Sequence, residues 1–421
     1  MSSGNALAAM KKVTIIVVLM LGVFFVSSAD AAKARKPSER SVMHNNLGVT
    51  ALYQEGDIDK AIFEFKTAVE VNPEYVEGWA NLGLAYKHKG RLDDAIEVLK
   101  KAISLDRKFA TPYNTLGTVY HTRGDYDEAL KYLKLATKYN KKYSDAHYNQ
   151  GLVYTEWYRK DHNKEHLGKA VEAFRTATEI NSDHPYAHYK LANVYQILGK
   201  YEDAILRYRL ALEIDPKLED AWNNLAQLYT VTGQTLKAQQ ALNHALAANP
   251  DSPEAHINMG LNFLKDDNIS MAIKEFNEAI KQDPTNELAY FNVGFAYYQQ
   301  AINLQKQGRS SDVASLLQES IRAYTSAFKI KPNYPQATYN IGYDYQLLKD
   351  YPNAVTWFQK TISIDADYHQ AYFSLGLVYQ LLGQSDNAAK AFCQFVKRNP
   401  SGAETDVNTA SDMLKSLGGC H

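Results

Sequence analysis

Residues 79–86 read WANLGLAY and residues 95–102 read AIEVLKKA, and these two stretches decide the fold. Their small and large apolar residues return every three or four positions, which is the spacing of one helix face. The pattern recurs with starts near residues 42, 76, 110, 144, 185, 219, 253, 287, 335 and 369, mostly 34 residues apart. Such a period predicts stacked helix pairs, because no single pair can bury its apolar face alone.

One small residue in the first helix of each repeat explains how the two helices approach each other closely. This position is occupied by Gly48, Gly83, Gly117, Gly151, Ala192, Ala226, Gly260, Gly294, Gly342 and Gly376. Six repeats end in proline, which cannot continue a helix and therefore ends it.

The ten matches resemble the tetratricopeptide repeat (TPR) over residues 42–400, nearly the whole chain after its N-terminus. The resemblance implies an all-α fold, a right-handed superhelical α-solenoid of about ten helix pairs whose first helices line the inner surface. After the repeats, apolar residues at Val407, Ala410, Leu414 and Leu417 follow one helical stripe. They predict a capping helix within a C-terminal segment, residues 401–421, that covers the last repeat.

Three repeats depart from the regular length. Residues 144–184 form a 41-residue repeat and residues 287–334 a 48-residue repeat, which are seven and fourteen residues longer than the rest. Seven residues make about two helical turns, so we expect longer helices, with both helices of the eighth repeat longer by two turns. In the first repeat, Gly48 and Gly56 are one residue further apart than Gly83 and Gly90.

The N-terminus has the features of an export signal. Lys11 and Lys12 precede an apolar run, residues 13–26, and small residues follow up to Ala31. We interpret residues 1–31 as a signal peptide that starts at Met10 and is cleaved after Ala31, with residues 32–41 as a linker. The alternative is an uncleaved inner-membrane anchor that faces the periplasm, although fourteen apolar residues are few for a core of about 30 Å. The sequence thus predicts an exported, periplasmic protein.

Charge and motifs argue against several functions. The chain has 46 Lys and Arg against 47 Asp and Glu, so it lacks the basic excess that nucleic-acid binding requires. No phosphate-binding glycine loop or haem motif occurs, and we predict neither a catalytic residue nor a cofactor. His162 and His166, with His184 and His188 nearby, could hold a metal weakly. Solvated polar side chains are the better interpretation, and no metal site is predicted.

The two cysteines, Cys393 and Cys420, lie on the last repeat and just beyond the capping helix. In an oxidising compartment an even number of cysteines favours pairing. We predict a disulfide between them; two free thiols remain the alternative.

A row of asparagines is the candidate binding site. The resemblance places the residue before each Leu-Gly pair on the inner surface, and we call this row the asparagine ladder: Asn46, Asn81, Asn149, Asn224, Asn258, Asn292 and Asn340. Thr115, Lys190 and Ser374 interrupt it. Side-chain amides both donate and accept hydrogen bonds and can hold a peptide backbone. The row is similar to the ladder of the O-linked N-acetylglucosamine transferase TPR domain. Simple TPR consensus is the alternative explanation.

Aromatic residues flank the ladder, increasingly toward the C-terminus: Tyr148, Tyr189, Phe291, Phe295, Tyr298, Tyr339, Tyr343 and Phe373. Such rings either mark a binding site or are buried between repeats. We predict a non-enzymatic scaffold that binds a peptide or protein segment in its concave groove, mainly between repeats seven and ten, and assists assembly of a bacterial envelope complex. The partner is not identified, and membrane contact would occur only through an uncleaved signal or through partners. The alternatives are an arm or accessory subunit of a glycosyltransferase and a metal or haem carrier.

Overall fold

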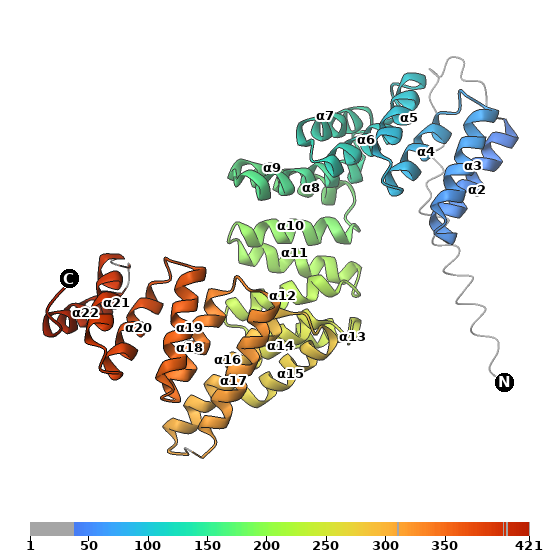
Figure 1. Ribbon diagram of the computed structural model, residues 1–421. Helices are drawn as coiled ribbons and strands as arrows, with labels where there is room; N and C mark the ends of the chain where they lie inside the picture. The colour runs from blue at the N-terminus through green and yellow to red at the C-terminus, as the bar shows by residue number, and fades with distance from the viewer. Residues whose placement is uncertain (1–37, 310, 399, 401–402, 421) are drawn as a thin grey trace, which may run out of the picture. The chain divides into compact units, whose positions relative to one another are not determined.

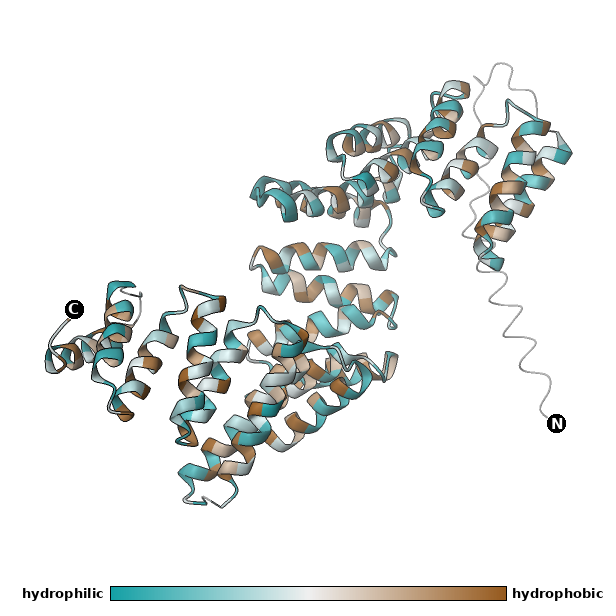
Figure 2. Cartoon of the chain, viewed as in Figure 1, coloured by the Kyte–Doolittle hydropathy of each residue, from teal (hydrophilic) through white to brown (hydrophobic). Residues whose placement is uncertain are grey.

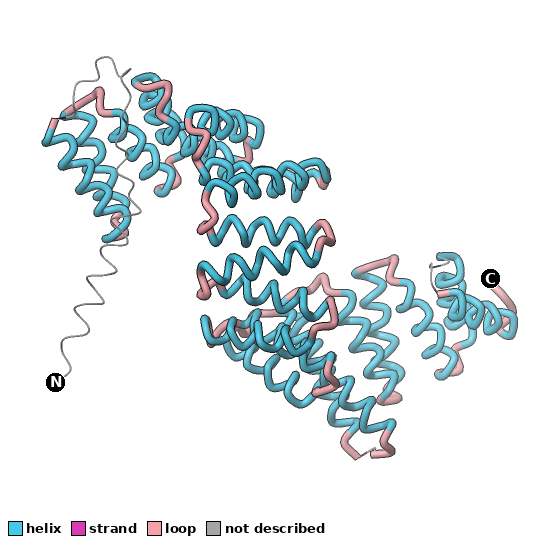
Figure 3. The backbone as a smooth tube through the Cα atoms, turned by 180° about the vertical axis from the view of Figure 1, so that it is seen from behind, coloured by secondary structure: helices cyan, strands magenta, loops and turns pink. Residues whose placement is uncertain are grey.

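The computed structural model describes residues 38–309, 311–398, 400 and 403–420, and every regular element in them is helical. Figure 1 shows the helices as consecutive antiparallel pairs, and Figure 3 shows the short loops that join them. The chain divides into two compact units, residues 1–149 and 150–421. The predicted signal peptide, residues 1–31, lies outside the described residues.

The first unit contains three complete helix pairs and the beginning of a fourth. Its elements are α2 (Glu39–Thr50), the π-helix η1 (Ala51–Glu55), α3 (Ile58–Val71), α4 (Val76–His88), α5 (Leu92–Leu105), α6 (Ala110–Arg123), α7 (Tyr126–Tyr139) and the start of α8 (Ser144–Asp161). Helix α2 begins three residues before the predicted start of the repeats at residue 42.

The second unit contains the remaining helix pairs and a final single helix. Its elements are α9 (Lys164–Ile180), α10 (Pro185–Ile197), α11 (Tyr201–Ile214), α12 (Glu219–Val231), α13 (Thr235–Ala248), α14 (Pro253–Lys265), α15 (Ile269–Gln282), α16 (Glu287–Lys306), α17 (Val313–Ile330), α18 (Pro335–Leu347), α19 (Tyr351–Ile364), α20 (His369–Leu381), α21 (Ser385–Arg398) and α22 (Glu404–Ser416). The predicted all-α fold of about ten helix pairs and a capping helix is confirmed.

The small residue of the first helix makes room for a large side chain of the second. A methyl group on Gly83 would lie 2.4 Å from Cγ of Leu99, a side chain that is fully buried. The same group on Gly376 would lie 2.5 Å from Cε1 of Phe392. The core is therefore a series of such contacts between neighbouring helices. Figure 2 shows hydrophobic and hydrophilic residues alternating along the helices.

A recurring hydrogen bond anchors the loop before six of the helix pairs. The side chain four residues before the small position donates to the carbonyl oxygen six residues earlier. Trp79 Nε1 donates to Pro73 O at 2.9 Å, and Trp222 Nε1 donates to Pro216 O at 3.0 Å. Equivalent contacts are made by Tyr113, His188, His256 and Tyr372. These bonds satisfy carbonyls that a helix end would leave unpaired.

The extra residue of the first repeat produces the π-helix η1. Residues 51–55 form this wider turn, and Gly56 closes it with a φ of 69°, a left-handed conformation that glycine adopts without strain. One residue is thus added without rotating the apolar face of α3 away from α2. The spacing of glycines in the sequence already contained this signal.

The lengthened eighth repeat differs from the expectation. Helix α16 has 20 residues against 13 in α4, whereas α17 has 18 against 14 in α5. The first helix therefore gains two turns as predicted, but the second gains about one turn. The prediction of two extra turns in α17 is wrong, because the remaining residues lengthen the loop before Val313.

The capping helix α22 covers the last repeat. Ala410 and Leu414 are buried in one cluster with Phe392 and Phe395. Cys393 and Cys420 form a disulfide with a Cα–Cα distance of 5.7 Å. The two cysteines are 27 positions apart in the sequence. Closing a loop of this length stabilises the folded state by roughly 3.5 kcal/mol in the chain-entropy model.

Within the part of the chain that the structure describes, none of the helices combines the length and the apolar character that crossing a bilayer requires.

Candidate peptide-binding surface

The first helices form the inner face of each unit. In the first unit α2 contacts α4 and α4 contacts α6; in the second, α12, α14 and α16 follow one another in contact, as do α18 and α20. Successive second helices make no comparable contacts among the described residues. A stack curves toward the side on which its helices lie closest together, so the ladder is on the concave side.

In the first unit, ladder amides bind the neighbouring repeat. Asn81 Nδ2 donates to Oδ1 of Asn45 at 2.9 Å, and Asn149 Nδ2 donates to Oδ1 of Asn114 at 2.9 Å. The acceptor in both cases is the residue that precedes the ladder position of the previous repeat. Asn46 belongs to the first repeat and is exposed.

The same arrangement continues in the second unit. Asn224 Nδ2 donates to the Tyr189 hydroxyl at 3.3 Å, and Ser374 Oγ lies 3.2 Å from the hydroxyl of Tyr339. Ladder side chains therefore join successive first helices. Sequence reasoning missed this role, although a polar residue directly before the ladder position was visible in each of these repeats.

The arrangement fails at the seventh and eighth repeats, where the preceding residue is apolar. Ile257 stands at the acceptor position opposite Asn292, and the Nδ2 atom of Asn292 is buried without a hydrogen-bond partner. Asn258 instead accepts a bond from Gln227 Nε2 at 3.3 Å. In the ninth repeat the ladder residue is Asn340, which is half-buried, and the apolar Phe291 stands at the acceptor position opposite it. In this segment the side-chain nitrogen of Asn292 therefore makes no hydrogen bond within the fold.

All eight flanking aromatic residues are half-buried. Four of them form a continuous row on α16 and α18, which we call the aromatic row: Phe295, Tyr298, Tyr343 and Tyr339. Their successive ring centroids lie 6.3, 6.1 and 6.3 Å apart, which is the range of favourable ring contacts.

The other four aromatic residues are placed differently. Phe291 packs on Tyr324 at 5.2 Å, Tyr189 on Tyr208 at 6.0 Å and Phe373 on Phe395 at 5.1 Å. These three rings therefore contribute to the packing of their own repeats. Tyr148 is half-buried on α8, in the first unit.

A buried carboxyl group lies beside the aromatic row. Asp344 of α18 is 1% exposed, and burial raises its pKa to about 7 although a hydrogen bond with Ser320 opposes the shift. Its charge in turn contributes to the raised pKa of Tyr298 and of Tyr324. The Oδ2 atom has no hydrogen-bond partner. Buried polar atoms are usually paired, so this group has an uncompensated cost.

The sequence contained a signal for this group. Two residues after the small position, most repeats carry Ala, Val or Leu, but the seventh carries Asn262 and the ninth carries Asp344. Asn262 is fully buried, and neither polar atom of its side chain is paired. A polar residue at a regular core position was therefore recognisable from the repeat alignment, and we did not single it out.

The histidine cluster does not assemble into a metal site. His166 Nε2 lies 3.1 Å from Asp161 Oδ2, and the His166 ring stacks on Trp157 with centroids 4.4 Å apart. His188 Nε2 instead bonds the Ser182 carbonyl at 3.0 Å. The residues that the structure describes contain no group of three or more His, Cys, Asp or Glu side chains arranged to hold a metal.

Comparison with known proteins gives one family. Models of the tetratricopeptide repeat match residues 50–90, 75–142, 173–206, 196–257, 268–301, 342–383 and 369–401, which together are more than half of the chain. No curated protein matches the sequence.

Several solved structures are similar. MamA is 30% identical, with 42% of this chain and 93% of MamA covered and a TM-score of 0.34. PilF of Pseudomonas aeruginosa is 20% identical, covering 54% and 98%, with a TM-score of 0.45. YrrB, described as a TPR protein with an unusual peptide-binding site, is 21% identical, covering 48% and 96%, with a TM-score of 0.37.

Proposed function

Because the chain belongs to the tetratricopeptide-repeat proteins, which are scaffolds for protein and peptide interaction, we propose that it holds a segment of a partner protein against α16, α18 and α20. We further propose that it does so outside the cytoplasm, as an assembly factor for a complex of the bacterial envelope. No chemical step is needed for this role.

The observation that carries the proposal is the surface between repeats seven and ten. There the aromatic row lies half-buried beside two unpaired polar atoms, Nδ2 of Asn292 and Oδ2 of Asp344. Half-buried rings bind well because a partner can bury their remaining apolar surface. In the same region the side-chain nitrogen of Asn292 lacks the inter-repeat bond that occupies Asn81 and Asn149.

Export rests on the N-terminal sequence alone. A positively charged start, an apolar run up to residue 26 and small residues before Ala31 are typical of a cleaved signal peptide. Fractionation of the source bacterium, followed by N-terminal sequencing, tests this directly. We expect a soluble periplasmic protein that starts at Ala32; recovery of the full-length chain in the membrane fraction would favour the anchor instead.

Photo-crosslinking tests the binding surface inside the cell. With p-benzoylphenylalanine at Tyr343, we expect one protein to be crosslinked reproducibly and to be identified by mass spectrometry. The same group at Phe63, which is 65% exposed on the second helix α3, serves as the matched control. Crosslinking to the same protein from both positions with equal yield would contradict a specific surface.

Substitution then tests whether the surface holds that partner. Tyr339 contacts the rings of Phe358 and Tyr368, so truncating it would weaken the fold as well as the surface. Asn292→Ala combined with Tyr343→Ala is the better variant. We expect it to lose capture of the crosslinked protein at least about tenfold with an unchanged circular dichroism spectrum. Undiminished capture would refute the proposal.

A further inference from the structure

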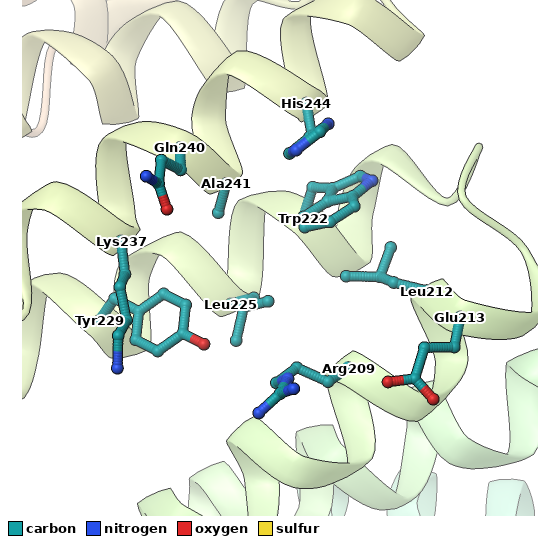
Figure 4. A pocket seen from close by; sticks show the side chains of 10 residues that line it. All are labelled: Arg209, Leu212, Glu213, Trp222, Leu225, Tyr229, Lys237, Gln240, Ala241 and His244. Atoms are coloured by element: carbon teal, nitrogen blue, oxygen red, sulfur yellow. The ribbon is translucent and has the colours of Figure 1, made fainter.

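A hollow lies between α11, α12 and α13, away from the aromatic row. Its volume is about 460 Å³, and Figure 4 shows the side chains around it. Leu212, Trp222, Leu225 and Ala241 form its apolar lining. Arg209, Glu213, Tyr229, Lys237, Gln240 and His244 supply polar groups at its edge.

The residue at one position of the second helix helps to leave room for the hollow. In several repeats the first-helix residue four before the small position faces a second-helix residue 19 or 20 positions later. In the first repeat these residues are His44 and Glu64, and in the seventh they are His256 and Glu275, each pair 2.7 Å apart.

In the sixth repeat the two positions hold Trp222 and Ala241. The methyl group of alanine leaves the space that Val98 and Tyr132 occupy in the second and third repeats, although alanine also stands at this position as Ala173, Ala323 and Ala391.

The wall of the hollow is held in place. Trp222 Nε1 donates to the Pro216 carbonyl at 3.0 Å, and the indole stacks on His244 with ring centroids 4.5 Å apart and planes 20° apart. An aromatic face fixed in this way binds a ligand without first losing conformational freedom.

The polar groups are distributed asymmetrically. In Figure 4, Lys237 and Tyr229 lie at one end of the hollow, Glu213 lies at the other, and Arg209 lies between them. Among the described residues, Arg209 is exposed and makes no ion pair or side-chain hydrogen bond. Lys237 donates to Gln234 Oε1 at 2.7 Å and lies 5.6 Å from the centre of the Tyr229 ring. One end of the hollow is therefore cationic.

We propose that this hollow is a second binding site, for a short partner segment that carries a bulky apolar side chain next to a carboxylate. The apolar side chain enters between Trp222 and Leu225, in the space left by Ala241. The carboxylate lies between Arg209 and the end that carries Lys237, and accepts hydrogen bonds from Arg209. Complementary charge selects an acidic segment over a basic one, and a side chain enclosed by aromatic and aliphatic groups supplies most of the affinity.

The test uses a fluorescein-labelled nine-residue peptide with a central Phe-Asp pair in a Gly-Ser frame, titrated with the full chain and followed by anisotropy. Peptides with Phe-Lys and Ala-Asp at the centre are the ligand controls. We expect saturable binding of the Phe-Asp peptide only. Ala241→Trp fills the hollow and should weaken binding at least about tenfold, and Arg209→Glu about fivefold, the size of one ion pair at a surface.

Lys100→Glu is the matched protein control. Lys100 on α5 is the residue equivalent to Arg209 on α11. In the repeat that follows Lys100, Tyr132 occupies the position equivalent to Ala241. This variant should bind the peptide within twofold of wild type. If Ala241→Trp does not fold, Arg209→Glu decides alone, because its side chain is on the surface.

Any of three results with the peptides and the Ala241→Trp variant would overturn the proposal: equal binding of the Phe-Lys peptide, undiminished binding by a folded Ala241→Trp variant, or no saturable binding of the Phe-Asp peptide. A fourth comes from the concave surface. The double variant Asn292→Ala, Tyr343→Ala must still bind the peptide. If it does not, the peptide occupies the concave surface and the second site is refuted, whereas the proposed function would stand.

Discussion

Asp344→Asn should stabilise the ninth repeat in a pH-dependent way. Burial raises the pKa of Asp344 from 3.8 to about 7. The folded state therefore binds a proton that the unfolded state has lost between these two pH values. Stability falls as pH rises through this range, and the full cost is present above pH 7. A shift of about three units corresponds to about 4 kcal/mol at most.

Asparagine keeps the shape of the side chain and removes its charge. Part of the gain is lost because the new Nδ2 group takes the place of Oδ2, which has no partner. We therefore expect about 2 kcal/mol of stabilisation at pH 8.5. At pH 5 the wild-type carboxyl is protonated and neutral, so the substitution should have almost no effect.

Hydrogen exchange followed by mass spectrometry is the suitable assay, because repeats open locally and a single global transition is not guaranteed. In peptides from α16 and α18 the variant should be protected roughly thirtyfold better than wild type at pH 8.5, and equally at pH 5. Asp386→Asn, at an exposed carboxylate on α21, should change neither value. An equal effect of Asp344→Asn at both pH values would refute the reasoning.

Four further substitutions test the packing. Cys420→Ser should destabilise the capping helix by roughly 3 kcal/mol and increase hydrogen exchange in α22; unchanged exchange would show that the disulfide adds nothing. Gly376→Ala should cost about 1–3 kcal/mol, because the added methyl group would lie 2.5 Å from Phe392, and an unchanged midpoint of urea unfolding would contradict this. The His256 ring donates a hydrogen bond to the Glu275 carboxylate, and this bond raises the pKa of His256. The stabilisation is therefore complete below pH 6.5 and is lost as pH rises through the folded-state pKa. His256→Gln should therefore destabilise the fold mainly at acid pH. Burial lowers the pKa of His188, so His188→Gln should instead stabilise the fold at acid pH. Thermal unfolding at pH 5.5 and 8 measures both effects.

The regular features of the fold were predictable because each depends on residues close in sequence. The 34-residue period located the helix pairs, and the small residue at Gly83 or Gly376 indicated where two helices touch. The glycine spacing around residue 52 contained the extra residue that the π-helix absorbs. The length of α17 was not predictable, since the added residues could extend either the helix or the loop before it.

The candidate site was predictable only in part. Residue positions on the first helices placed the ladder and the aromatic residues on one face. They could not show that Asn81 bonds Asn45 while Asn292 has no partner, because that depends on the residue which the previous repeat presents 35 or 36 positions away. The sequence also could not show which aromatic rings form the aromatic row and which pack within the core of their own repeat. Both arrangements have the same helical spacing.

By itself, the amino-acid sequence determined the family, the helix pairs and the helix face on which the ladder lies, because helical periodicity is a local property of the chain. Only the tertiary structure decided which polar atoms remain unpaired beside the aromatic row and that Ala241 leaves a hollow beside Trp222. The physical reason is that burial and free volume are properties of neighbouring repeats packed together, and a side chain has neither until its neighbours are in place.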